Sequence, residues 1–240
     1  MTTYNGENYV IEQLRSILPQ LGDDDELLIF DDRSSDKTTT LVRDTVENDD
    51  RVRVHINPLN LGHLKNFEQA ILHATGDVVV LSDQDDIWFD NKLEVIRRSF
   101  ADEPNLTMFH HSFKLIDSNG VADSEIMGVS ELASTPPIKN YNDSSKLTKI
   151  VRLFTSNHYY GCCMAFKKIG FDGFPSSAYA HDHYLALMHL MRGKVVCSEC
   201  ALINYRIHNN NVTPKKVNPL SKKIGYRIKL LKNALYILCR

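Results

Sequence analysis

Apolar residues recur along the first hundred positions in two kinds of pattern. Blocks with helical character are separated by short continuous apolar runs, which are typical of strands buried on both faces of a sheet. The predicted helices cover residues 7–20, 37–47, 64–74 and 88–97. The predicted strands cover residues 27–30, 52–56 and 78–81. This alternation indicates βαβ units, so we expect an α/β fold with a mixed, mainly parallel sheet and helices on both faces.

The second half of the chain has weaker periodicity. Residues 117–149 contain Ser, Asn and Pro without a clear repeat, and we interpret them as a long loop region. After this region we predict a strand or turn over 157–166, a helix over 182–192, short strands over 194–196 and 201–205, and a basic amphipathic helix over 222–238. We therefore expect one domain over residues 1–212 and a tail over 213–240.

Polar clusters follow three of the strands. Thr2 to Tyr4 favour a strand that runs into the turn residues Asn5-Gly6, and residues 27–30 run into Asp31-Asp32. The apolar run 78–81 is followed by Ser82-Asp83-Gln84-Asp85-Asp86. Ligands of parallel α/β sheets bind at the carboxyl ends of the strands, so these clusters predict one shared site.

Three carboxylates lie within four residues, at Asp83, Asp85 and Asp86. Like charges this close repel unless a cation or hydrogen-bond donors offset them, and Mg²⁺ prefers oxygen ligands. The alternative is a solvated acidic turn before the helix expected from about Trp88, although the Trp and the buried strand favour a site. The role of Asp31-Asp32 is equally open, because an Asp before a helix is often its N-cap.

Two segments are candidates for phosphate binding. Gly62 and Lys65 stand at a helix start, where backbone and ammonium groups can meet phosphate, but the pattern is also ordinary turn chemistry. Arg206 and His208 end a predicted strand ahead of three amide side chains. They would contact a diphosphate or its metal ion, or they form a polar loop that enters the tail.

Asp182 precedes an apolar helix and is either its N-cap or a general base in a cleft. The flanking His181 and His183 suggest zinc only weakly, because further ligands are missing. The C-x-x-C at residues 197–200 has no second pair, and Cys162-Cys163 lies in an apolar stretch typical of a core.

Composition adds one asymmetry. The chain of 240 residues is 42% hydrophobic and 24% charged, as in ordinary soluble domains. Its net charge of −2 conceals a basic end, since no Asp or Glu occurs after Glu199. No signal peptide is recognisable, no apolar run reaches the roughly 18 residues of a membrane span, and the scattered cysteines fit a reducing compartment. We expect a cytoplasmic protein.

Together these segments resemble the large inverting glycosyltransferase family 2, whose members have the GT-A fold. The matching pieces, in order, are Thr3-Tyr4-Asn5-Gly6-Glu7, residues 31–36, Asn60-x-Gly62-x-x-x-Asn66, residues 83–86, His181-Asp182 and Tyr205-Arg206-x-His208. Each motif alone is modest, but their order over residues 2–212 is specific. Residues 82–88 with His181-Asp182 look most like bacterial rhamnosyltransferase-like members that build surface polysaccharide.

The resemblance implies a function and a role for each matching residue. It implies an enzyme that transfers a sugar from a nucleotide-diphosphate donor, for instance dTDP-rhamnose, to a growing cell-surface glycan. Residues 1–110 would bind the nucleotide sugar and residues 111–212 the acceptor. The implied nucleotide-sugar ligands are Tyr4, Asn5, Glu7, Asp31, Asp32, Lys65 and Asp83. The implied ligands of Mg²⁺ or Mn²⁺ are Asp83, Asp85 and His208, and the implied catalytic base is Asp182.

The sequence departs from the family pattern in two places. Arg33 replaces the Gly that is more usual after the acidic pair, which would crowd the nucleotide pocket or supply a cation. The apolar half-strand that precedes the Thr-x-Tyr-Asn segment in family members is missing, so we expect a shortened first strand. A misassigned start codon or a truncated gene would account for it.

The basic tail fits a protein that works on a lipid-linked or polysaccharide acceptor. Apolar residues between Ile224 and Leu238 would contact lipid while Lys and Arg meet anionic headgroups, which would place the protein on the inner face of the cytoplasmic membrane. The alternative is a helix packed on the catalytic domain. We expect no nucleic-acid partner.

Two other functions compete with this interpretation. A catalytically degenerate relative would bind a nucleotide sugar or a glycan without turnover; the motif acids argue against it and the short first strand argues for it. A nucleotidyltransferase would share the acidic metal site, but it does not explain Asp182 or the segment from Tyr205 to His208.

Overall fold

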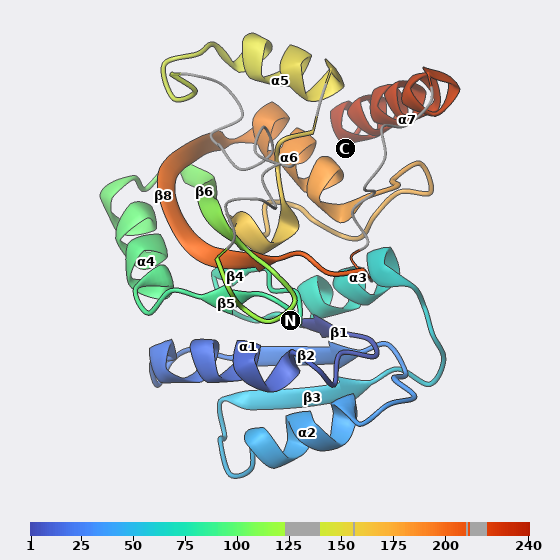
Figure 1. Ribbon diagram of the computed structural model, residues 1–240. Coiled ribbons are helices and arrows are strands. Elements are labelled where there is room, and N and C mark those ends of the chain that lie inside the picture. Colours follow the sequence, from blue (N-terminus) through green and yellow to red (C-terminus); the bar gives the residue numbers. More distant parts are fainter. Residues whose placement is uncertain (123–139, 156, 210, 212–219) are drawn as a thin grey trace.

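The protein is described by a computed structural model that covers residues 1–122, 140–155, 157–209, 211 and 220–240 (Figure 1). Much of the predicted loop region over 117–149, Asn210 of the polar segment and residues 213–219 of the tail lie outside the described residues.

The N-terminal part forms a three-stranded parallel sheet in the order β1-β2-β3. Its strands are β1 (Thr2–Thr3), β2 (Leu27–Asp31) and β3 (Val52–Ile56). The helices between and after them are α1 (Val10–Ile17), α2 (Thr38–Thr45) and α3 (His63–His73). β2 is buried along its whole length, as its apolar run predicts. Each predicted element of this region is present, and β1 is as short as expected, pairing with two residues of β2.

The remaining strands form a five-stranded sheet in the order β4-β7-β6-β8-β5. They are β4 (Val78–Val80), β5 (Ile87–Trp88), β6 (Leu106–Ile116), β7 (Met164–Lys167) and β8 (Lys194–Arg206). β6 and β8 run parallel, while the other pairs are antiparallel. The backbone N–H of Thr2 donates to the carbonyl of Ser82 just beyond β4, which joins the two sheets. The predicted mixed α/β fold is confirmed.

Two strands in the second sheet differ from the prediction. β6 was not predicted, because the polar run His110-His111-Ser112 interrupts its apolar pattern although all three residues are buried. β8 is one long strand where two short ones were expected. Its polar residues 198–200 form a bulge between the pairs His110–Cys197 and Ser112–Ala201, so pairing with β6 resumes after the interruption.

Two helix boundaries also differ. Trp88 does not begin a helix; it pairs with Ile203 of β8, and α4 (Lys92–Asp102) begins four residues later. α5 (Lys146–Thr155) begins inside the region predicted as loop. The predicted helices near the C-terminus are confirmed as α6 (His181–Arg192) and α7 (Leu220–Leu238). No helix in the described part of the chain combines the length and the apolar character needed to cross a membrane.

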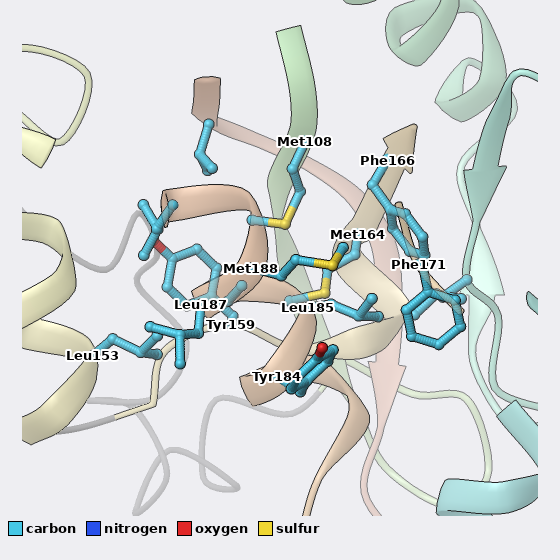
Figure 2. Close-up of a cluster of buried hydrophobic side chains, with 14 of the residues drawn as sticks. Met108, Leu153, Tyr159, Met164, Phe166, Phe171, Tyr184, Leu185, Leu187 and Met188 are labelled. Carbon is cyan, nitrogen blue, oxygen red and sulfur yellow. The ribbon is translucent and has the colours of Figure 1, made fainter. Parts of the chain in front are cut away.

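The core around α6 holds the second sheet to the helices. Leu185, Leu187 and Met188 of α6 lie against Met108 of β6 and Met164 of β7 in one buried cluster (Figure 2). Nine of the twelve residues of α6 are buried, which explains its weak amphipathic pattern. A helix buried on nearly all sides is fixed in position, so the residues at its N-terminus are presented to the strand ends at a defined place.

Candidate active site

The acidic segment after β4 is held against the end of β8. Oδ2 of Asp85 lies 2.8 Å from Nε2 of His208, and the imidazole stacks on Tyr9 with ring centroids 4.8 Å apart. Oδ1 of Asp86 accepts a hydrogen bond from the backbone of Arg206 at 3.1 Å. Asp86 is buried, and only 16% of the Asp85 side chain is exposed, so this segment is not a solvated turn.

One carboxylate of this segment, that of Asp86, is poorly compensated. Oδ2 of Asp86 is buried without a hydrogen-bond partner among the described residues. Burial, followed by the charges of Asp85 and Asp83, raises the pKa of Asp86 well above its usual value. Asp83, Asp86 and Cys162 place ligand atoms within 4.8 Å of one another. A hydrogen bond with Cys163 and burial raise the pKa of the Cys162 thiol, which leaves oxygen atoms as the donors, and a hard divalent cation fits such a set.

Asp182 lies in the first turn of α6, where Ala180 is the N-cap, so the capping alternative is wrong. Oδ1 of Asp182 accepts from the backbone of His183 at 2.6 Å, and Oδ2 accepts from Nδ2 of Asn157 at 3.1 Å. Burial raises the pKa of Asp182 to about 6 despite these hydrogen bonds. A carboxylate of this basicity is ionised at neutral pH and accepts a proton more readily than an ordinary Asp.

His63 is a site residue to which the sequence analysis assigned no role. Its Nε2 lies 3.8 Å from Oδ1 of Asp83, and its ring centroid lies 4.8 Å from that of His181. Desolvation lowers the pKa of His63, but Asp83, Asp182 and Asp85 outweigh it and the pKa is raised overall. The charges of the three acids expected for the site therefore all act on one imidazole, which Asp83 approaches directly. The signal in the sequence was its position directly after Gly62 at a helix start.

The two histidines beside Asp182 are buried and pack against other parts of the protein. His181 is buried and stacks on Phe67 with centroids 4.2 Å apart, and burial lowers its pKa to about 3. Nε2 of His183 contacts the carbonyl of Leu153 at 3.2 Å. Neither histidine belongs to a group of metal-ligand atoms within the described residues, which removes the support for a zinc site here.

The acidic pair after β2 is engaged by the protein itself. Asp31 accepts hydrogen bonds from Oγ1 of Thr3 and from the backbone and hydroxyl of Ser34, at 2.6–2.7 Å. Asp32 accepts three more at 2.7–2.9 Å, from the side chain of Asn57 and the backbone N–H groups of Leu61 and Gly62. Both acids are buried. Asp31 thereby holds the end of β1 and the loop that follows β2, and Asp32 holds the loop that follows β3, at the carboxyl edge of the sheet.

The loop after β1 lies between the acidic segment and the start of α2. The side-chain amide of Gln84 bonds to both backbone groups of Tyr4, at 2.8 and 2.9 Å. Asn5 has a φ of 47° and its Oδ1 accepts from the backbone of Ser35. These contacts bring the segments after all three predicted strands together, and they leave the Tyr4 side chain half exposed.

Glu7 and Lys65 both carry contacts within the protein. The carboxylate of Glu7 accepts from the backbone of Lys37 at 3.0 Å. Nζ of Lys65 lies 2.5 Å from Glu68, and about half of the Lys65 side chain stays exposed. These two residues lie on the loops bordering the carboxyl edge, one after β1 and one at the start of α3.

Arg206 holds the acidic segment in place. Its guanidinium is buried and contacts Glu12 at 2.5 Å, the carbonyl of Asp85 at 2.8 Å and the ring of Tyr9 at 4.9 Å. A cation at this position offsets the neighbouring carboxylates and ties α1 to the end of β8. Its polar atoms are occupied by protein partners, so the diphosphate contact considered for Arg206 is not supported.

Solved structures of glycosyltransferases share this architecture. TarS of S. aureus in complex with UDP superposes with a TM-score of 0.63 at 20% identity, over 86% of this chain and 59% of that chain. The mannosyltransferase PcManGT of Pyrobaculum calidifontis, in complex with GDP-Man and Mn²⁺, has a TM-score of 0.62 at 19% identity, over 99% of this chain and 72% of its own. The protein thus has the GT-A glycosyltransferase fold.

The family follows from the sequence comparison. Residues 1–174 match the family described as Glycosyl transferase family 2, and the chain belongs to this family. The E. coli protein named UDP-Glc:alpha-D-GlcNAc-diphosphoundecaprenol beta-1,3-glucosyltransferase WfgD is 24% identical over 93% of this chain and 81% of its own length. An uncharacterized glycosyltransferase of Haemophilus influenzae is 30% identical over half of this chain. The chain spans about half of that protein's length and 58% of a matching mycobacterial protein.

Proposed function

We propose that this protein is an inverting glycosyltransferase that moves a sugar from a nucleotide-diphosphate donor to a growing bacterial cell-surface glycan. One observation carries the proposal: Asp182, with a pKa raised to about 6, follows His181, whose ring lies 4.8 Å from that of His63, and His63 lies 3.8 Å from Asp83 of the acidic segment. A base and a cation-binding acid cluster beside each other are the two parts that direct displacement at an anomeric carbon requires.

Asp182 is the proposed catalytic base. Its carboxylate would accept the proton of the acceptor hydroxyl as that oxygen attacks the sugar from the side opposite the diphosphate, which inverts the anomeric centre. The hydrogen bonds from His183 and Asn157 fix the carboxylate without protonating it. An ionised carboxylate near the sugar also tolerates the oxocarbenium character of the transition state.

Asp83, Asp85 and His208 would hold Mg²⁺ or Mn²⁺. The fit is supported by the contact of Asp85 with His208 and by the unpartnered buried oxygen of Asp86, which a cation would compensate. When bound, the ion supplies Lewis-acid neutralisation of the charge that develops on the leaving diphosphate. Arg206 keeps the acidic segment aligned for it.

The donor would lie along the carboxyl edge of the parallel strands. The residues proposed to contact it are Tyr4, Asn5, Glu7, Asp31, Asp32, Lys65 and Asp83. Asp31 and Asp32 each accept three hydrogen bonds already, and a carboxylate has about four acceptor sites. Each acid therefore retains about one lone pair for a nucleotide base or ribose. We propose that residues 1–110 bind the donor and residues 111–212 bind the acceptor.

The acceptor class rests on relatives. The E. coli relative is named for a diphosphoundecaprenol-linked acceptor, and other structural relatives were solved with UDP, UDP-GlcNAc or GDP-Man. We propose a lipid-linked or polysaccharide acceptor and a location at the inner face of the cytoplasmic membrane. dTDP-rhamnose remains one donor to test beside UDP and GDP sugars.

A donor panel tests the proposal. The protein is mixed with dTDP-, UDP- and GDP-sugars, with and without Mn²⁺, and thermal stabilisation is measured beside metal-dependent release of the nucleoside diphosphate. We expect one donor class to stabilise the protein and to be slowly hydrolysed only with metal. Binding without hydrolysis or transfer to any acceptor preparation would favour the degenerate relative, and no binding at all would overturn the proposal.

A further inference from the structure

Helix α7 has two opposite apolar faces. Leu230 and Ile237 belong to the buried core around α6, and the buried Asn233 between them accepts a hydrogen bond from Ser177 at 2.5 Å. Arg192 of α6 also donates to the carbonyl of Ile237. The alternative expected for the tail, a helix packed on the domain, is therefore correct for one face.

The other face of α7 is an exposed apolar stripe. Its members are 48–71% exposed and are spaced alternately four and three residues apart: Ile224, Ile228, Leu231, Leu235 and Leu238. With about 3.6 residues per turn, this spacing aligns them along one side of the helix. Single exposed apolar residues are ordinary, but a continuous stripe along 15 residues marks an interaction surface.

The neighbouring helix α5 also has exposed apolar residues. Leu147 and Val151 of α5 are 69% and 53% exposed, one helical turn apart. Both α5 and α7 pack on α6, and Arg227 of α7 donates to the carbonyl of Phe154 at the end of α5 (Figure 1). We define the α5–α7 surface as Leu147, Val151 and the stripe of α7.

The charged residues of the two helices themselves are all basic. Exposed basic residues accompany the apolar side chains on both helices: Lys146, Arg152, Lys222, Lys223, Arg227, Lys229 and Lys232. Neither α5 nor α7 contains Asp or Glu. In a symmetric pair of copies, the two basic margins would face each other and repel. An anionic lipid surface offers both the apolar layer and the opposite charge.

We propose that the α5–α7 surface docks on a membrane that contains anionic phospholipid, with the stripe of α7 in the acyl boundary and the basic side chains at the headgroups. The proposed membrane contact is thus formed by two helices that lie far apart in the sequence. From the sequence, only α7 was expected to contact the membrane. It does not depend on the proposed transfer reaction, because lipid binding needs neither donor nor acid cluster.

Vesicle flotation of the full chain tests this proposal. The protein is mixed with vesicles of phosphatidylcholine alone or with added phosphatidylglycerol, at low and high salt. We expect flotation only with phosphatidylglycerol and weaker binding at high salt. Leu231→Glu with Leu235→Glu should reduce binding at least about tenfold, since it removes apolar contact and adds anionic charge. Lys232→Glu should weaken binding by at least about fivefold, on the order expected for one surface cation.

Matched controls lie elsewhere on the molecule. Leu72→Glu changes an exposed leucine of α3, and Arg43→Glu changes an exposed cation of α2, at the far end of the molecule from α7 (Figure 1). Both should bind vesicles like the unchanged chain, and all variants are checked by thermal melting. Equal flotation with phosphatidylcholine alone, or no flotation, would overturn the proposal. So would a dimer in solution that the Leu231 and Leu235 substitutions separate, because the stripe would then bind a second copy.

Discussion

Two acidic clusters follow strands in this protein, the first after the buried β2 and the second after the half-buried β4, and their surroundings differ. Asp31 and Asp32 each accept three hydrogen bonds from protein groups, and these partners come from β1 and from the segments after β2 and β3. In the segment after β4, Asp86 has an unpartnered buried oxygen and a raised pKa, and Asp85 contacts only an imidazole through its side chain in the described residues. The residue types are the same, but both acids of the first cluster are compensated by donors, whereas Asp86 of the second keeps one buried oxygen without a partner among the described residues.

This difference separates a scaffold from a reactive site. Acids whose oxygens are satisfied by donors of the fold stabilise loops, since each buried donor left without a partner costs free energy. Acids left without donors are costly to the fold and are suited to a cation or a proton. Asp182 has two donors and is still suited to accept a proton, because burial outweighs its two hydrogen bonds and raises its pKa to about 6.

The largest effect is expected for Asp182→Asn. This change removes the proposed base and keeps the shape and the hydrogen bond from Asn157 within reach. Transfer should fall on the order of 10³-fold, within the range of general base catalysis, while donor affinity stays unchanged. Product formation and donor titration by calorimetry measure the two quantities. Turnover near that of the unchanged protein would refute the assignment of Asp182.

A loss of about 100-fold or more is expected for Asp85→Ala, because the ion proposed to supply several kcal/mol to the transition state would lose a ligand. The chelator EDTA should abolish transfer by the unchanged protein, and added Mn²⁺ should restore it. Activity measured against Mn²⁺ concentration provides the test. If the variant keeps the same activity and the same metal dependence, Asp85 is not a metal ligand.

Asp32→Ala should act on stability. The change leaves the donors of Asn57, Leu61 and Gly62 without their acceptor, so the free energy of unfolding should fall by about 2–4 kcal/mol. Urea denaturation measures the loss, and Asp32→Asn, which keeps one acceptor oxygen, should lose less. Unchanged stability combined with lost donor affinity would instead make Asp32 a nucleotide ligand first and a scaffold residue second.

A tenfold decrease in kcat/KM per pH unit is expected below pH 6. Burial raises the pKa of Asp182 to about 6, so the carboxyl is protonated below that pH and cannot accept a proton. Activity should therefore rise with pH through 6 and then level off. A profile of kcat/KM against pH tests this, with the residual activity of Asp182→Asn as control. An acid limb centred near pH 4, or one that persists in the control, would contradict it.

The first half of the fold was predicted closely from the sequence, because continuous apolar runs such as residues 27–30 indicate a buried strand by their composition alone. The prediction failed at β6, whose buried His110 and His111 look polar, and at β8, whose exposed bulge looks like a break between two strands. In both cases pairing with a distant strand overrode the local pattern. His63 lies inside the motif from Asn60 to Asn66 and was given no role, because its surroundings depend on Asp83, Asp182 and Asp85 from other elements.

The sequence by itself determined the order of strands and helices, the acids at the strand ends, and a basic terminal helix with apolar residues around it. Only the tertiary structure decided which acids are satisfied and which are not. Asp32 receives donors 25–30 residues away, and Asp182 receives one 25 residues away, so neither environment is visible in the local sequence. Hydrogen bonds and desolvation costs depend on which groups the fold brings together. For that reason, only the packing of the chain shows which acids have a raised pKa or an oxygen without a partner.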